Sequence, residues 1–150
     1  MPVLRTVENV VMYSLLLVVA FGISGDEAKD HTAIQRVLDD QAVAWNKGDL
    51  PGFMKGFLKS EELTFFSGNK KTKGWQATLD RYRKTYQAAD KEMGKLSFNE
   101  MSIELLGTDH ALVRGRYHLR LKKENPTGIF TLILRKTPAG WRIVHDHTSA

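Results

Sequence analysis

The period of the hydrophobic pattern changes once along this chain, near Gly94, and this change constrains the fold more than any other feature. Between residues 30 and 87, most apolar side chains recur every three or four positions, which is the period of one face of an α-helix. From Leu96 onward they recur every second position, as on one face of a β-strand. A helical half followed by a strand-rich half predicts an α+β fold, with helices packed on one face of a curved antiparallel sheet.

Three helices and one short strand are predicted in the first half. The first helix begins at Asp30, a residue type that caps helix N-termini, and ends at Gly48. Asp49 can cap a second, shorter helix, and a strand over residues 62–67 and a loop over residues 68–74 precede the third. The side chains expected to face the core are Ile34, Val37, Leu38, Gln41, Ala42 and Trp45 from the first helix, Phe53, Met54, Phe57 and Leu58 from the second, and Trp75, Leu79, Tyr82 and Tyr86 from the third.

Four long strands are predicted in the second half, over residues 96–105, 111–123, 129–136 and 141–149. In the first of these strands the alternation slips by one residue at Asn99–Glu100, which predicts a β-bulge that bends the strand. A bent sheet folded over a long helix encloses a cone. The open end of such a cone is a natural ligand pocket.

Composition excludes several classes of protein. The 150 residues are 42% hydrophobic and 26% charged, which is ordinary for one globular domain. The absence of cysteine excludes a disulfide scaffold, a thiolate nucleophile and a Cys-ligated metal. A net charge of +5 is too small to predict a nucleic-acid partner. The motifs of nucleotide-binding loops, serine nucleophiles and zinc peptidases do not occur, so we expect no cofactor and no metal.

The N-terminal residues 1–24 are predicted to be a secretory signal. The apolar run over residues 10–23 would rise about 21 Å as a helix, which is less than the roughly 30 Å hydrocarbon core of a bilayer. Small residues precede a cleavage site after Ser24, which predicts a secreted or periplasmic protein with one domain over residues 30–150. The alternative is an uncleaved anchor, which would be the only contact with a membrane.

Several residues, taken in order, resemble the nuclear transport factor 2-like superfamily, specifically its SnoaL-like branch. They are Trp45, Gly48-Asp49 and Phe53 around the end of the first helix, Gly74 before the third, and the segments 128–134 and 140–149. The closing W-x-I-x-H-x-H-x-S pattern also resembles the association domain of calcium/calmodulin-dependent kinase II, a branch of the same superfamily. The resemblance spans residues 30–150 and implies a cone-shaped α+β barrel that forms homodimers through its outer sheet face.

The resemblance also bears on chemistry. Ketosteroid isomerases of the superfamily carry a general-base carboxylate at the end of the first strand. This chain has Phe65-Phe66-Ser67 there, which argues against steroid isomerisation. SnoaL-like cyclases place an acid–base aspartate on a late strand that faces the cavity, and Asp146 is the nearest candidate here.

Two histidines alternate on the last predicted strand. Simple alternation places His145 and His147 on the face of Ile143, and Asp146 on the opposite face. One histidine could act as acid or base near neutral pH. A three-His zinc site formed together with His118 is a second alternative, and a structural or interface role at the chain end is a third.

Basic residues fill one face of the strand over residues 111–123, opposite an apolar face. They are Arg114, Arg116, His118 and Arg120. Such a stripe is typical of the solvent-exposed face of a half-buried sheet. The alternative places Arg116 and His118 at the cavity mouth, where they would bind a carboxylate or a similar anion. In that case the apolar face must pack in a dimer interface.

The expected lining of the pocket is aromatic. It consists of Trp45, Phe57, Phe66, Trp75, Tyr82 and Tyr86. Aromatic residues at helical spacing occur in ordinary cores as well as in ligand pockets. The hydroxyls of Tyr82 and Tyr86 suit the polar end of a pocket, because a buried hydroxyl needs a partner.

Three functions follow from these patterns. The first is an exported domain that binds a small apolar or weakly acidic molecule without catalysis. The second is a SnoaL-like isomerase, cyclase or hydrolyase in which His118, His145 or Asp146 is the acid or base and Arg116 holds an anion. The third is a homodimeric association domain with a purely structural role.

Overall fold

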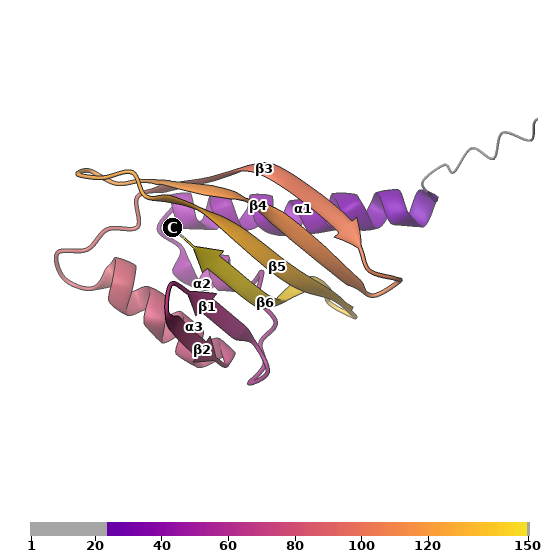
Figure 1. Cartoon of the computed structure of the whole chain (residues 1–150). Coiled ribbons are helices and arrows are strands. Elements are labelled where there is room, and N and C mark those ends of the chain that lie inside the picture. Colours follow the sequence, from indigo (N-terminus) through magenta and orange to yellow (C-terminus); the bar gives the residue numbers. More distant parts are fainter. Residues whose placement is uncertain (1–23, 150) are drawn as a thin grey trace, which may run out of the picture.

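The computed structural model describes residues 24–149, so the predicted signal up to residue 23 lies outside the described residues. Figure 1 shows one long helix running along a curved sheet, with the shorter helices gathered near one of its edges. The elements in chain order are α1 (Gly25–Asn46), α2 (Leu50–Met54), β1 (Thr64–Ser67), β2 (Lys70–Lys73), α3 (Trp75–Tyr82), the π-helical turn η1 (Arg83–Gln87), β3 (Lys95–Leu105), β4 (His110–Arg120), β5 (Thr127–Thr137) and β6 (Gly140–Ser149).

Six strands form one mixed sheet in the order β2-β1-β6-β5-β4-β3. Neighbouring strands are antiparallel except β1 and β6, which run parallel. Strands β2 and β3 are the two edges, so hydrogen bonds do not close the described sheet into a barrel. The predicted α+β fold is confirmed, with an open curved sheet in place of the barrel that the resemblance implied.

Helix α1 begins earlier than the hydrophobic pattern predicted, with Ser24 rather than Asp30 as its N-cap. The Ser24 hydroxyl accepts the backbone N–H of Glu27, and the Glu27 carboxylate accepts that of Ser24, which together make a capping box. The Asp30 carboxylate instead accepts a hydrogen bond from Trp141 Nε1 at 3.0 Å and so fastens α1 to β6. Cleavage after Ser24 would remove the capping hydroxyl.

The predicted boundary between the first two helices agrees with the structure, but the second helix ends at Met54, before Phe57 and Leu58. Gly48 has a φ of 76°, which lets the chain leave α1 sharply. The Asp49 carboxylate accepts a backbone N–H at 2.9 Å at the start of α2. Helix α3 ends at Tyr82 and continues to Gln87 as a π-helical turn, and both Tyr82 and Tyr86 pack against the core. Such π-helical turns are frequent at functional sites.

The loop predicted over residues 68–74 is wrong, because Lys70–Lys73 form strand β2 and pair with β1. The lysines of this strand are exposed and no apolar side chain marks a buried face, so the sequence carries no period-two signal there. Exposed lysines are typical of an edge strand, where they discourage pairing with another chain.

The four long strands of the second half are confirmed, and so is the bulge predicted in the first of them. The register of β3 against β4 shifts between Asn99 and Ser102. Glu100 has a φ of 51°, a left-handed conformation that allows the extra residue to leave the ladder. The bulge bends β3 over the helical layer.

A second bulge lies in β6, and the sequence pattern did not reveal it. Ile133 of β5 pairs with His145 of β6. The next residue, Leu134, pairs with Ile143, which leaves Val144 as the extra residue. One extra residue reverses the faces from which all later side chains project. Residues after Val144 therefore lie on the faces opposite to those that simple alternation predicts.

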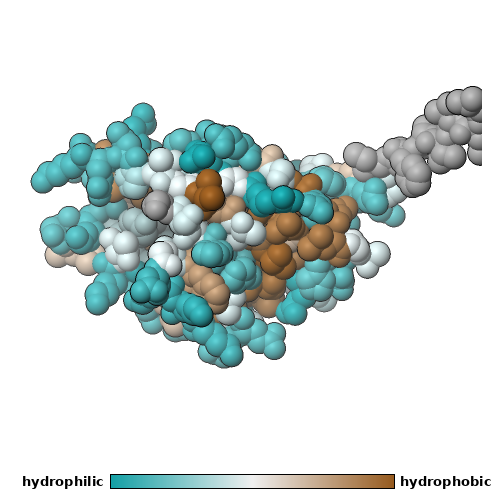
Figure 2. Space-filling model, in the orientation of Figure 1, coloured by the Kyte–Doolittle hydropathy of each residue, from teal (hydrophilic) through white to brown (hydrophobic). Residues whose placement is uncertain are grey.

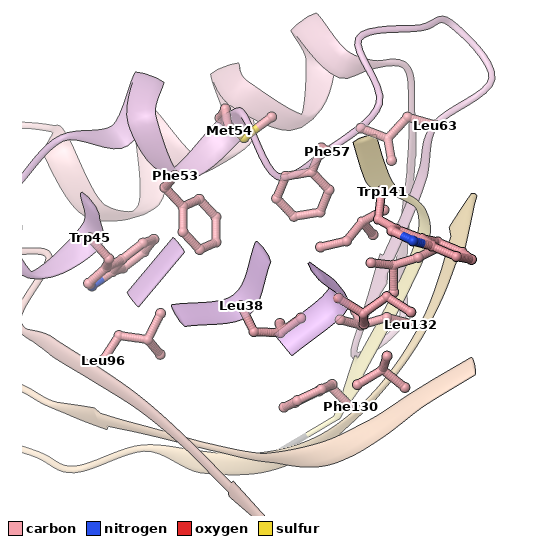
Figure 3. Close-up of a cluster of buried hydrophobic side chains, with 14 of the residues drawn as sticks. Leu38, Trp45, Phe53, Met54, Phe57, Leu63, Leu96, Phe130, Leu132 and Trp141 are labelled. Atoms are coloured by element: carbon pink, nitrogen blue, oxygen red, sulfur yellow. The ribbon is translucent and has the colours of Figure 1, made fainter. Parts of the chain in front are cut away.

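The core lies between the helices and the inner face of the sheet. Figure 3 shows Trp45 and Phe53 on the helical side of this core. Leu96 and Phe130 lie opposite them on the sheet, with Leu38 of α1 in between. None of the helices within residues 24–149 is both long and apolar enough to cross a membrane.

The outer face of the sheet carries both apolar and basic side chains. Figure 2 shows hydrophobic side chains gathered over β4, β5 and β6, with hydrophilic ones around them. Ile129 is 55% exposed, and Leu112, Ile133 and Val144 are half-buried. Leu112 pairs directly with Ile133, so apolar side chains of neighbouring strands adjoin on this face.

Candidate ligand cavity

A cavity of about 160 Å³ lies between the helices and the inner face of the sheet. All the helical segments and every strand except β2 contribute to its wall. Its buried floor consists of Leu38, Trp45, Phe53, Phe57, Phe130 and Leu132. Its more accessible side, which we call the mouth, consists of Ser67, Arg81, Thr85, Tyr86, Tyr117 and Thr148. The cavity therefore has an apolar end and a polar end.

The floor is held in place by hydrogen bonds that leave it apolar. Trp45 Nε1 donates to the carbonyl of Met93 at 2.7 Å, and the Trp45 ring meets the Phe53 ring edge-on at 4.9 Å. Gln41, which adjoins the floor, donates its Nε2–H to the carbonyl of Phe53 at 3.2 Å. The indole N–H of the floor is thus engaged, and the floor presents apolar carbon to any ligand.

The bulge in β6 turns Asp146 into the cavity, where its side chain is buried. Thr148 Oγ1 donates to Asp146 Oδ1 at 2.7 Å, and within the described residues nothing else hydrogen-bonds this carboxyl. Burial raises the pKa of Asp146 to about 7, although the Thr148 hydroxyl and the Arg81 charge favour the ionised form. The second carboxyl oxygen is therefore available to a ligand, with or without a proton.

Three tyrosines surround the polar end of the cavity. Tyr82 of α3 stacks on Phe65 of β1 with ring centroids 5.2 Å apart, and Tyr86 and Tyr117 face it from η1 and β4. Burial raises the pKa of all three phenols, and the charge of Asp146 raises that of Tyr82 further. None of the three hydroxyls hydrogen-bonds another residue within 24–149, and none is fully buried. They are neutral groups that can donate to a ligand oxygen.

Arg81 is the cation of this site. Its guanidinium carbon lies 4.5 Å above the centre of the Phe65 ring. Its Nη1 donates to Thr72 Oγ1 at 3.0 Å, and longer contacts of 3.4 Å reach the carbonyls of Lys70 and Ser67. The β1–β2 hairpin thus holds the guanidinium at the mouth of the cavity.

Most of the aromatic residues expected in the pocket do line it. The cavity wall includes Trp45, Phe57, Tyr82 and Tyr86. Trp75 and Phe66 do not line it. Trp75 donates its Nε1 to the carbonyl of Met54 at 3.1 Å, where α3 meets α2. Phe66 projects from the outer face of the sheet, because its neighbour Phe65 projects inward.

The expectation that His145 and His147 share the face of Ile143 is wrong. The extra residue Val144 reverses the alternation, so both histidines project from the outer face. There His145 Nδ1 lies 2.6 Å from Thr64 Oγ1. Burial and the neighbouring His147 lower the pKa of His145. Neither histidine lines the cavity, so neither is placed to act on a ligand there.

Arg116 and His118 also lie outside the cavity. Arg116 Nε contacts a carboxylate oxygen of Glu100 at 3.2 Å, and His118 Nε2 contacts Asn99 Oδ1 at 3.2 Å, both across the β3–β4 ladder. The alternation that turns Tyr117 inward forces its two neighbours outward. Strand β5 separates His118 from the histidines of β6, and no cluster of three metal-binding side chains occurs within residues 24–149.

Sequence reasoning missed the roles of Tyr117 and Arg81. Tyr117 could have been found, because the apolar face of its strand must turn toward the helices in a sheet that covers them. No comparable signal marks Arg81. Its position depends on the β1–β2 hairpin, which leaves no hydrophobic pattern in the sequence.

Comparison with known proteins shows the family of this chain. Residues 34–150 match the family described as the SnoaL-like domain. The chain belongs to the SnoaL-like family. This SnoaL-like domain is similar to an NTF-2 like protein of unknown function from Shewanella oneidensis MR-1, with 38% identity and a TM-score of 0.75 over 80% of this chain and 98% of that one. The predicted membership of the nuclear transport factor 2-like superfamily is confirmed.

More distant structures share the fold of this SnoaL-like domain. A nuclear transport factor 2 (NTF2-like) superfamily protein from Salmonella enterica serovar Typhimurium is 23% identical, with a TM-score of 0.64 over 80% of this chain and 92% of that one. A putative calcium/calmodulin-dependent protein kinase type II association domain from Thiobacillus denitrificans is 20% identical, with a TM-score of 0.64 over 77% and 92%. No match is found among curated proteins.

Proposed function

We propose that this SnoaL-like domain binds a small apolar or weakly acidic molecule in its cavity. The observation that carries this proposal is the joining of an aromatic floor and a buried carboxyl, Asp146, in one cavity. An apolar cavity of about 150 Å³ in another protein holds one benzene molecule. A cavity of about 160 Å³ therefore fits a ligand whose body is about the size of a single ring.

The polar groups of the cavity suit a ligand with one oxygen-bearing group. Ligand pockets combine an apolar lining with a few polar groups that set orientation. With its pKa raised to about 7, Asp146 can donate a hydrogen bond when neutral and accept one when ionised. The Tyr82 hydroxyl adds a donor on the same side. A weak acid, an alcohol or a carbonyl compound meets these requirements.

Acid–base catalysis by Asp146 is the second candidate. Its raised pKa lies close to neutral pH, where a group that takes up and returns a proton is most effective. Asp146 is also the register partner of Phe65 in β1, beside the segment where the superfamily's isomerases carry their base. In such an isomerase, cyclase or hydrolyase, Asp146 would accept a proton from the substrate and return it. This candidate requires a substrate that the wild-type protein converts. Asp146→Asn should abolish that turnover but still bind the substrate.

A homodimer through the outer face is a separate proposal. Leu112, Ile133, Val144 and the 55% exposed Ile129 form adjoining apolar surface on that face. A second copy of this face would cover it, as the superfamily resemblance implied. Sedimentation of wild type and Ile133→Asp tests the proposal. We expect a dimer that the substitution converts to a monomer, and a wild-type monomer at high concentration would contradict it.

A thermal-shift experiment with paired variants tests ligand binding. Leu132 and Ile133 are neighbours in β5 on opposite faces, so Leu132→Phe fills part of the cavity whereas Ile133→Phe does not. Benzyl alcohol, benzoate and cyclohexanol are the probes. A probe at 100 times its Kd stabilises the fold by about 2.7 kcal/mol, a shift of several degrees in Tm.

We expect at least one probe to raise the Tm of wild type and of Ile133→Phe, and to leave Leu132→Phe unchanged. A shift that persists in Leu132→Phe would place binding elsewhere. No shift with any of the probes in wild type would contradict the proposed function.

A further inference from the structure

The mouth of the cavity carries a positive charge that forms no ion pair with a described residue. Within residues 24–149, no carboxylate oxygen lies within 4.0 Å of the Arg81 guanidinium, whereas Arg83 two residues later contacts Asp80 at 3.6 Å. Arg81 is half-buried and its contacts are all to neutral groups, namely Thr72 and two backbone carbonyls. A half-buried cation of this kind attracts an anion more strongly than one in bulk water.

The guanidinium is also positioned before any ligand arrives. Its central carbon lies 4.5 Å from the centre of the Phe65 ring. The hairpin atoms contact Nη1 and Nη2, which leaves the Nε–H without a partner among the described residues. A guanidinium held in one orientation loses little conformational freedom when it binds a carboxylate. Strand β2 contributes no side chain to the cavity wall, but it helps to hold Arg81 in place at the mouth.

Uncharged donors lie on the same side of the cavity as this cation. The hydroxyls of Tyr82, Tyr86 and Tyr117 have no hydrogen-bond partner among the described residues, and the Arg81 charge acts on both Tyr82 and Tyr86. Asp146 is the only carboxyl in the described cavity wall, and burial favours its neutral form. An anion at the mouth would therefore meet one cation and several neutral donors.

We propose that Arg81 is the anion-binding group of this cavity and that the ligand is a small monocarboxylate with an apolar body the size of one ring. The carboxylate lies at the mouth against Arg81 and the tyrosine hydroxyls, and the apolar body lies on the floor formed by residues such as Trp45 and Phe130. This inference rests on the proposed binding function and assigns its ligand class. It also assigns the anion to Arg81 in place of Arg116, the residue named by the alternative interpretation of the basic stripe.

Isothermal titration calorimetry at pH 6 with two probes of equal size tests the inference. Benzoate carries the charge, and benzyl alcohol is its neutral counterpart. The variants are Arg81→Met, Arg81→Lys and the matched control Arg83→Met, whose side chain is outside the cavity. Because charge-assisted hydrogen bonds are stronger than neutral ones, we expect wild type to bind benzoate about tenfold more tightly than benzyl alcohol.

The preference for benzoate should disappear in Arg81→Met, persist in reduced form in Arg81→Lys, and be unchanged in Arg83→Met. The ratio of the two affinities is the measured quantity in each protein, and an unchanged far-UV circular dichroism spectrum in Arg81→Met and Arg81→Lys excludes a general loss of structure. If wild type binds benzyl alcohol as tightly as benzoate, the inference is wrong and the proposed binding function stands. If wild type binds neither probe, both fail.

Discussion

The inner and outer faces of the sheet are built from the same strands, yet they differ in almost every physical property. In β5, Phe130 and Leu132 project inward and are buried, whereas their neighbour Ile129 projects outward and is 55% exposed. In β4, Tyr117 lines the cavity while Arg116 pairs with an exposed carboxylate on the other side. Because successive side chains of a strand project from opposite faces, the role of each residue in this sheet depends on its position in that alternation.

Strand β6 shows how little is needed to exchange the two faces. One extra residue, Val144, turns Asp146 inward and the histidines beside it outward. Without the bulge, the cavity would have contained imidazoles and the carboxyl would have faced solvent. The acid–base chemistry open to the site is thus set by backbone register as much as by residue type.

The largest difference between the faces should appear in stability. Phe130→Ala removes a buried ring from the core, and we expect it to lower the free energy of unfolding by about 3–5 kcal/mol. Ile129→Ala, measured at a protein concentration low enough for the monomer, alters an exposed side chain on the opposite face and should change it by less than about 0.5 kcal/mol. Urea denaturation of both variants measures the difference, and equal losses would show that β5 is not oriented as described.

A second difference concerns pH. Burial raises the pKa of Asp146 to about 7 from its ordinary value of 3.8, so between these pH values the folded state holds a proton that the unfolded state releases. The free energy of unfolding should therefore fall as pH rises from about 4 to 7, by about 4 kcal/mol at most. Asp146→Asn keeps an acceptor for Thr148 and should not show this fall.

Denaturation of Asp146→Asn between pH 4 and 8 checks this expectation. The variant should be more stable than wild type at pH 8 and nearly equal to it at pH 4. His147→Asn, on the outer face of the same strand, serves as the control and should retain the fall of the wild type. A wild type with the same stability at pH 5 and pH 8 would mean that the Asp146 carboxyl is solvated.

The smallest effect is expected from the charged residues of the outer face. Arg116 and Glu100 form an exposed pair at 3.2 Å, so Arg116→Ala should cost less than about 1 kcal/mol, and less again at high salt. The substitution should leave the binding of benzoate unchanged, since Arg116 is outside the cavity. Calorimetry that showed weaker benzoate binding in Arg116→Ala would support the alternative in which Arg116 binds the anion.

Local signals in the sequence were sufficient for most of the fold. Apolar periodicity located the helices and the long strands, and the parity slip at Asn99–Glu100 located the bulge in β3. The bulge at Val144 left no such slip, because Trp141, Ile143 and His145 continue a plausible alternation. Strand β2 was missed for a related reason, since its pairing depends on backbone hydrogen bonds rather than on a buried face.

The candidate site was predictable where it coincides with the core and not where it depends on long-range register. Trp45, Phe57, Tyr82 and Tyr86 face inward because helical periodicity requires it. The inward direction of Asp146 depends on the pairing of β6 with β5, and the position of Arg81 depends on the hairpin beside α3. Neither contact has a local signature in the sequence.

The most direct test of the account is a methyl NMR titration of the protein with benzyl alcohol. Leu132 and Ile143 line the cavity, whereas Ile129 and Ile133 project from the outer face of the same sheet. The account predicts that the methyl resonances of Leu132 and Ile143 shift as the probe binds, and that those of Ile129 and Ile133 do not. Shifts confined to the outer-face isoleucines, or no shift at either face, would contradict it.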